Sequence, residues 1–151
     1  MFSSSTIGVA AAADYVPQPV AVATFVDKIG GKRTFGCRSV ERSIILPNKQ
    51  AVSTYIQQAF VATLIEANRY DRHSDYTLRG EITLVDFNTT SGYWLIRGRF
   101  NMANGAPVMV SGKYPFASSW GSDRACDHAA AAFDQAVQSF VGDVLTRLSN
   151  A

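Results

Sequence analysis

The segment that decides the fold is NKQAVSTYIQQAFVATLIEANRY, residues 48–70, which predicts one long amphipathic helix. Asn48 suits the N-cap of this helix, and Pro47 stands just before it. Core-facing side chains then recur at three- and four-residue spacings: Val52, Tyr55, Ile56, Ala59, Phe60, Thr63, Leu64 and Ala67. A helix with one such stripe needs a flat surface to cover, so we expect the rest of the chain to supply a sheet.

Three segments after the helix, residues 76–87, 93–102 and 107–116, show the two-residue alternation of half-buried antiparallel strands. The side chains expected to face the core are Tyr76, Leu78, Gly80, Ile82, Leu84, Trp94, Ile96, Gly98, Phe100, Met102, Val108, Val110, Gly112, Tyr114 and Phe116. Before the helix, residues 20–26 are apolar on both sides and predict a central strand. Residues 34–46 are ambiguous and would suit a short edge strand.

The turn at Asn104 and Gly105 is the strongest hairpin signal and allows a prediction of register. A plain two-residue turn would place Phe100 opposite Met109, which would turn the apolar side chains of the last strand away from the core. Keeping both apolar sets in the core requires a different register, for example Phe100 opposite Val110. We therefore predict a three-residue or bulged turn.

A second amphipathic helix is expected over residues 124–149, with Ala129, Phe133 and Phe140 on its apolar face. The order of elements predicts an α+β fold, namely a two-layer sandwich. Its mainly antiparallel sheet of about four strands would carry two long helices on one face. Residues 17–150 are expected to form a single domain, and residues 1–16 a flexible leader.

Composition places few limits on function. Of the 151 residues, 47 % are hydrophobic and 17 % charged, which is typical of a folded domain and excludes a disordered tail. The net charge of +2 is too small to indicate a nucleic-acid-binding protein by itself. No apolar run reaches the roughly 18 residues that a membrane-spanning helix needs.

The strongest local charge lies in residues 27–42, where five basic side chains outnumber two acidic ones. The basic residues are Lys28, Lys32, Arg33, Arg38 and Arg42. This segment is either a solvated loop or a patch for anionic lipid headgroups, glycan phosphates or an acidic partner.

Two further groups are candidates for a binding surface. Arg79, Arg97 and Arg99 are expected on the sheet face that no helix covers. Val61 and Ile65 fall on the side of the first helix opposite its main stripe. Such a pair would contact either the C-terminal helix or another protein.

The motifs of common enzyme classes are absent: there is no G-x-S-x-G, H-E-x-x-H or C-x-x-C. Asp123, Asp127 and His128 are close in sequence, but carboxylates that stabilise a helix N-terminus are the better interpretation. We expect no enzyme activity and therefore no catalytic residue, cofactor, metal site or small-molecule substrate.

Cys37 and Cys126 are the two cysteines of the chain. They are either two unrelated buried thiols of a cytosolic protein or a disulfide that ties the early loop to the C-terminal helix. We expect the disulfide, and with it an oxidising compartment.

The sequence resembles small outer-membrane lipoproteins of Gram-negative bacteria, in particular YajG-like lipoproteins and the auxiliary lipoproteins of ABC-type envelope transporters. The matching segments are VAVATFVD at 20–27, the helix 51–67 followed by NRY, LRGEITLVDF at 78–87, GKYPF at 112–116 and the alanine-rich last helix. The resemblance covers residues 18–149, but no lipid-bearing cysteine follows a signal peptide near Met1. We therefore expect either an anchor outside the given sequence or a soluble periplasmic relative.

These features together predict a non-enzymatic cell-envelope protein that is periplasmic, either soluble or tied to the outer membrane through a lipid anchor. It would act as an accessory or adaptor in a transport or envelope-maintenance assembly. Its partner would be an envelope protein, or an anionic lipid or glycan. The alternative is a nucleic-acid-binding α+β domain that uses Arg97, Arg99, Tyr93 and the basic loop, with binding that weakens steeply in salt.

Overall fold

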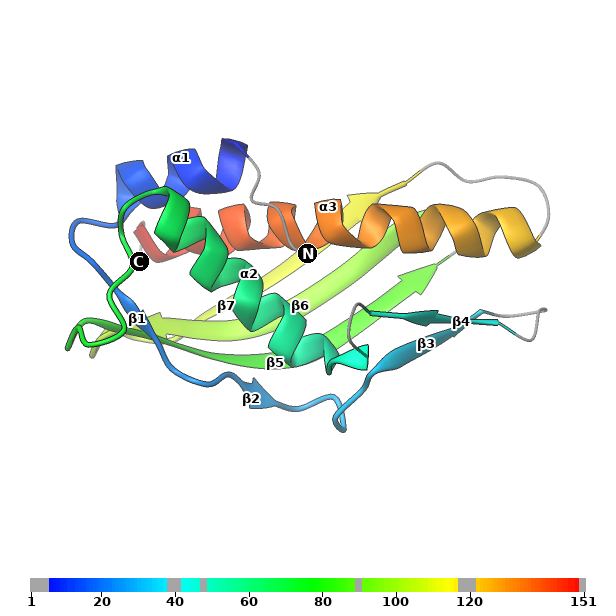
Figure 1. The fold of residues 1–151 in the computed structure, drawn as a ribbon, viewed down its shortest axis with the longest axis horizontal. Helices are drawn as coiled ribbons and strands as arrows, with labels where there is room; N and C mark the ends of the chain where they lie inside the picture. Colours follow the sequence, from blue (N-terminus) through cyan, green and yellow to red (C-terminus); the bar gives the residue numbers. More distant parts are fainter. Residues whose placement is uncertain (1–5, 38–41, 47–48, 89–90, 117–121, 150–151) are drawn as a thin grey trace.

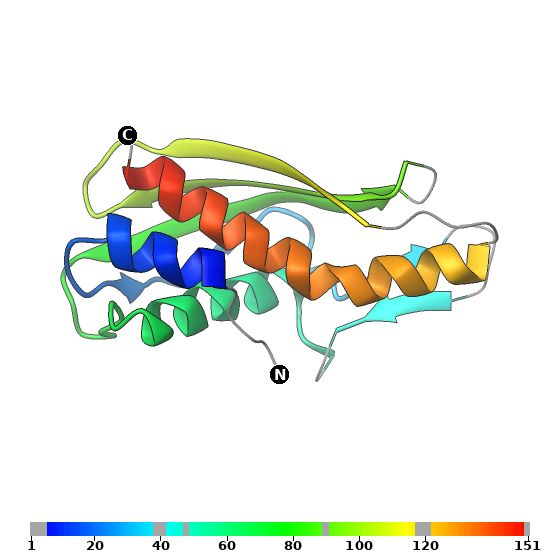
Figure 2. The ribbon, with the colours of Figure 1, turned by 90° about the horizontal axis from the view of Figure 1, so that it is seen from above.

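A computed structural model of the chain describes residues 6–37, 42–46, 49–88, 91–116 and 122–149. Its elements, in chain order, are α1 (Thr6–Tyr15), β1 (Ala21–Val22), β2 (Val26–Asp27), β3 (Thr34–Cys37), β4 (Arg42–Ile45), α2 (Val52–Glu66), β5 (Thr77–Asn88), β6 (Tyr93–Met102), β7 (Val108–Pro115) and α3 (Ser122–Ser149). The helices all lie on one side of a curved sheet (Figures 1 and 2). The predicted α+β class is confirmed.

The main sheet has the order β1-β5-β6-β7, with β2 also paired to β5. β5, β6 and β7 form the expected antiparallel meander, whereas β1 and β2 run parallel to β5. The prediction of one central strand over residues 20–26 was therefore wrong, because these residues form two short edge pieces. The chain leaves the sheet between them, where the Phe25 backbone N–H donates to Gln57 Oε1 (2.8 Å) and the Phe25 ring packs against Phe60.

The ambiguous segment 34–46 forms a separate two-stranded sheet. β3 and β4 pair with each other and with no strand of the main sheet. Phe35 of β3 reaches the main core, where its ring lies against Trp94 and Phe133. The hairpin therefore closes one end of the core instead of extending the sheet.

The first predicted helix is shorter at both ends than residues 48–70. Pro47 and Asn48, the expected start, lie outside the described residues; Lys49 has a φ of 51°, and α2 begins at Val52 after an N-cap at Ala51. The positive φ of Lys49 breaks the helical path before Val52. At the other end Asn68 has a φ of 56°, and the Arg69 N–H donates back to the Leu64 carbonyl (2.8 Å), which stops the helix.

The strand β5 contains a β-bulge, which changes one of the side chains predicted to face the core. Ile82 lies opposite Gly98, but Leu84 lies opposite Arg97, so Thr83 is an extra residue in β5. Leu84 consequently faces outward, contrary to the prediction. Val85 is buried in its place.

The predicted register of the β6–β7 hairpin is confirmed in that Phe100 does not pair with Met109. Phe100 lies opposite Val108, not opposite Met109, so both apolar sets face the core. The example pairing with Val110 is off by two residues. The connection spans residues 103–107, in which Ala103 adopts a φ of 53° and the Gly105 N–H donates to the Met102 carbonyl (2.9 Å).

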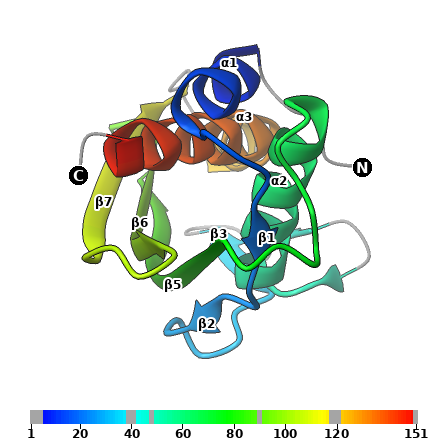
Figure 3. The same cartoon turned by 90° about the vertical axis from the view of Figure 1, so that its left-hand side faces the viewer.

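The prediction of a flexible leader was also wrong for residues 6–15, because these residues form α1. Figure 3 shows α1 lying across α3 and α2, on the side away from the sheet. Ala12 and Val16 are buried, and Arg69 Nε donates to the Val16 carbonyl (2.9 Å). Alanine favours helix and permits close approach, so this segment folds without an amphipathic pattern that would have revealed it.

The core lies between the sheet and the long helices α2 and α3. Phe100 is its centre, in contact with Phe25, Phe60 and Phe140. Two glycines make room for its ring, because a Cβ added at Gly80 or Gly98 would lie 2.6 Å from it. At the other end, Trp94 Nε1 donates to the Ala129 carbonyl (2.8 Å) and fixes α3 to β6.

Candidate functional site

The sheet face turned away from the helices is the candidate site. Arg79 of β5 and Arg97 and Arg99 of β6 lie on this face and are exposed, as the alternation predicts. Lys113 of β7 lies on the same face, since it is directly opposite Leu95 of β6. No described helix covers this side of the sheet (Figure 3).

Strand pairing places these four cations in a diagonal row. Arg99 is one diagonal step from Arg79, which pairs with Asn101, and Lys113 is one diagonal step from Arg97, which pairs with Ser111. Diagonal neighbours on a sheet are about 7 Å apart, and so are alternate residues of one strand. We call Arg79, Arg99, Arg97 and Lys113 the basic stripe; it crosses three strands at nearly even spacing.

The guanidinium groups of the stripe have no acidic partner among the residues that the structure describes. Arg97 Nε donates to Ser111 Oγ over a long 3.4 Å, and Lys113 Nζ lies 4.9 Å from the centre of the Tyr93 ring. Glu81 is opposite Arg99 in the register but forms no ion pair with it. The arginines therefore keep their donors available for an external carboxylate or phosphate.

Apolar side chains flank the stripe. Met109 is 50 % exposed and lies directly opposite Arg99; Val26, on the other side of β5, is 48 % exposed and pairs with Glu81. Surfaces that combine Arg, Met and aromatic residues are typical of protein interfaces.

The basic loop is less available than its sequence suggests. Lys32 Nζ lies 4.6 Å from the Phe35 ring centre, and Arg33 Nη1 donates to the Lys49 carbonyl (2.8 Å). Lys28 is exposed directly after β2, at the edge of the open face. Arg38 lies outside the described residues, and of Arg42 only the backbone, in β4, is described.

The outer pair of α2 lies elsewhere. Ile65 is 54 % exposed and Val61 is partly exposed. Both are on the helical side of the molecule, so the structure does not join them to the basic stripe. Lys113 and Met109 were not predicted as site residues. The alternation of β7 nevertheless places both on the other face of the sheet from Val108 and Val110.

The predicted disulfide is present. Cys37 at the end of β3 is bonded to Cys126 in α3, with Cα atoms 5.8 Å apart. It joins the β3–β4 hairpin to the long helix across a sequence separation of 89. Disulfides persist in oxidising compartments, so this bond is consistent with an extracytoplasmic protein.

With the sheet order, the helices and the disulfide defined, the chain can be compared with solved structures. Its fold is similar to that of XCC0632 from Xanthomonas campestris, described as a DUF330 protein. The TM-score is 0.55, the identity 14 %, and the match covers 87 % of this chain and 85 % of that one. At this identity the similarity shows the fold alone. No protein-family model matches the sequence, and no curated protein matches it.

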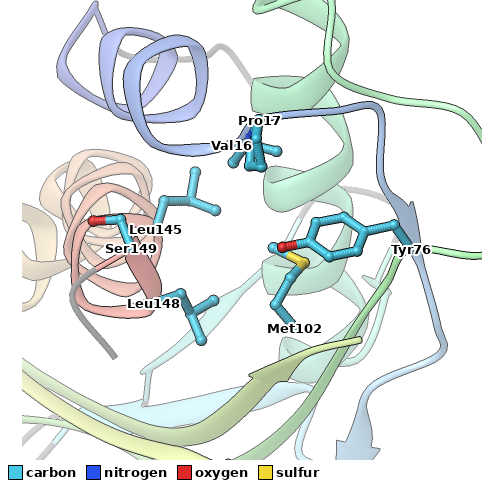
Figure 4. Close-up of a pocket in the computed structure, with 7 residues that line it drawn as sticks. All are labelled: Val16, Pro17, Tyr76, Met102, Leu145, Leu148 and Ser149. Atoms are coloured by element: carbon cyan, nitrogen blue, oxygen red, sulfur yellow. The ribbon is translucent and has the colours of Figure 1, made fainter. Parts of the chain in front are cut away.

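A small hollow lies at the opposite end of the core from the disulfide. Figure 4 shows its lining residues around the end of α3 and the start of β1: Val16, Pro17, Tyr76, Met102, Leu145, Leu148 and Ser149. The hollow opens to solvent, and its cavity volume of ≈ 30 Å³ is far below the size usual for small-molecule sites. None of its lining residues is charged.

No three His, Cys, Asp or Glu side chains come together as a metal site in the described ranges. None of the helices that the structure describes has the length and apolar character needed to cross a membrane.

Two tyrosine–aspartate pairs hold the helices in place. The Tyr55 hydroxyl donates to Asp134 (2.7 Å) and the Tyr114 hydroxyl to Asp143 (2.6 Å). Burial, then the hydrogen bond to the carboxylate and its charge, raise the pKa of both phenols well above the ordinary value of about 10. These hydroxyls therefore stay protonated near neutral pH and serve as structural donors.

The raised pKa values predict a loss of stability in alkali. Because the phenols ionise near pH 10 in the unfolded chain and at higher pH in the folded protein, their contribution to the free energy of unfolding is fully present below about pH 10 and is lost as the pH rises further. Urea titrations of the wild type and of Tyr55→Phe/Tyr114→Phe between neutral pH and alkali measure this. The variant should lose less stability over that range, and an identical pH slope would contradict the assignment.

Proposed function

We propose that this protein is a non-enzymatic accessory protein of the bacterial cell envelope, which binds a partner protein through the open face of its sheet. The observation that carries this proposal is the basic stripe, because it is exposed, forms no ion pair with any described residue and is flanked by Met109 and Val26. A domain with this arrangement can hold another molecule without performing chemistry on it.

The disulfide supports the proposed location in the periplasm. Cys37 is 6 % and Cys126 2 % exposed, so the bond is enclosed and serves the fold. The periplasm is the oxidising compartment in which such bonds form in Gram-negative bacteria. The sequence resemblance to envelope lipoproteins and transporter auxiliaries agrees with this location and supplies the role of adaptor in a transport or envelope-maintenance assembly.

A nucleic-acid-binding domain would use the same face, with Tyr93 beside Lys113 offering a ring for stacking. The disulfide argues against this alternative, since disulfides are rare in cytosolic and nuclear proteins, where most nucleic acid is bound. Glu81 and Asp86 on β5 also lower the charge of the face.

Thiol state in the native cells tests the location. Cells would be fractionated after rapid alkylation, and the protein would be identified by intact mass with and without prior reduction. We expect the protein in the envelope fraction, with both thiols unreactive until a reductant is added. Free, alkylated thiols in a cytosolic protein would overturn the envelope proposal.

A further inference from the structure

The geometry of the open face points to a particular kind of partner, and this inference rests on the proposed accessory function. We propose that the basic stripe binds an extended, acidic segment of the partner protein, with carboxylates at alternate residues. Each guanidinium would donate two N–H hydrogen bonds to one carboxylate, while Lys113 would act as a point charge.

Spacing is the first argument. Alternate side chains of an extended chain project on the same side at about 7 Å intervals. The steps from Arg79 to Arg99, from Arg99 to Arg97 and from Arg97 to Lys113 have the same length, two being diagonal steps and one a step along β6. One extended segment can therefore meet all four cations in turn.

The distribution of charge is the second argument. Glu81 and Asp86 share the face with the stripe, so the whole face carries four positive and two negative groups. A flat anionic membrane would meet both acidic side chains together with the cations. A narrow segment that follows the diagonal meets all four cations and borders one acidic side chain directly, Glu81 opposite Arg99. The net charge along its path stays positive and is complementary to an acidic segment.

The apolar flanks are the third argument. Met109 lies beside Arg99 on β7, and Val26 lies beside Glu81 on the far edge. Apolar side chains of a protein segment could cover these two groups, which would exclude water from the charge pairs and strengthen them. Lipid headgroups offer no such cover.

The test uses the full-length protein and a defined probe. A fluorescent, end-capped eight-residue peptide in which Glu alternates with Thr would be titrated at physiological salt and followed by anisotropy. The control peptide has the same composition with its four Glu in a row. We expect the alternating peptide to bind clearly more tightly than the control, because only the alternating spacing matches the stripe.

Matched variants locate the site. Arg97→Ala and Arg99→Ala should each weaken binding of the alternating peptide by about tenfold, the loss expected for a charge-assisted bidentate pair. Arg147→Ala removes an exposed cation of α3, on the helical side, and should leave binding unchanged. Thermal unfolding of each variant checks that the fold is kept.

Several outcomes would overturn the inference. These are absent binding, equal binding of both peptides, and equal losses in Arg97→Ala and Arg147→Ala. Preferential binding to phosphatidylglycerol vesicles or to single-stranded DNA would assign the stripe to lipid or nucleic acid. A failed peptide test leaves the accessory function standing if the same face still contacts an envelope protein in cells, so the two proposals fail separately.

Discussion

Removal of the Cys37–Cys126 disulfide is expected to lower the free energy of unfolding by about 4 kcal/mol, because the bond closes a loop of 89 residues in the unfolded chain. It also holds the β3–β4 hairpin against α3, where Phe35 completes the core around Trp94. The change to make is Cys37→Ser/Cys126→Ser, and urea unfolding at neutral pH measures the result.

Reduction of the wild-type protein provides the control, since it leaves both side chains in place. Reduced wild type and the double variant should unfold at similar urea concentrations, both well below the oxidised protein. If the double variant is destabilised by less than about 1 kcal/mol, the bond contributes little to the fold, and its role would have to be sought elsewhere.

Phe100→Ala is the second large effect, with an expected loss of about 4 kcal/mol, in the range measured for Phe-to-Ala changes in cores. The ring is fully buried among three other aromatic side chains and covers Gly80 and Gly98. Met109→Ala, on the exposed face, is the matched control and should change stability by about 0.5 kcal/mol or less. A similar loss in both variants would contradict the central position of Phe100.

The two glycines sharpen this prediction. The three atoms nearest to a Cβ at Gly80 would belong to the side chains of Phe100 and Phe25, whereas a Cβ at Gly98 would also lie 2.7 Å from the Glu81 carbonyl oxygen. Gly80→Ala should therefore be much better tolerated in a Phe100→Ala background than in the wild type, and Gly98→Ala should not. Equal rescue of both glycine variants would show that backbone contact at Gly98 is unimportant.

Much of the fold could be predicted because the relevant patterns are local. The alternation in β6 placed Trp94 and Phe100 inward and Arg97 and Arg99 outward, and the structure agrees. The two cysteines were sufficient to suggest their bond. The requirement that both strands of a hairpin face one core excluded the pairing of Phe100 with Met109.

The errors arose where tertiary contacts override local pattern. Residues 20–26 are apolar except for Thr24, yet the strand is interrupted at Phe25, because the Phe25 ring packs in the core and its N–H donates to Gln57. α1 has no amphipathic period, so its packing on α3 could not be seen in the sequence. A single bulged residue at Thr83 turned Leu84 outward.

The candidate site was predictable only in part. Arg79, Arg97 and Arg99 follow from alternation, but their diagonal alignment with Lys113 depends on the register of three strands. The exposure of Val26 depends on the edge position of β2, which the sequence suggested was central. The cluster of basic residues at 27–42 suggested a binding patch. In the structure, however, Lys32 and Arg33 contact nearby residues of the same chain.

Contact of the open sheet face with an envelope protein is the central claim, and site-specific photo-crosslinking in the native cells tests it most directly. A photoreactive residue would replace Ser111, exposed beside Arg97, and, as the control, Gln135, exposed on α3. We predict that Ser111 crosslinks to one protein, identified by mass spectrometry as an envelope component, and that Arg97→Ala/Arg99→Ala abolishes the product while Gln135 gives none. No product from Ser111, a product insensitive to the two arginines, or a crosslink to nucleic acid would contradict the account.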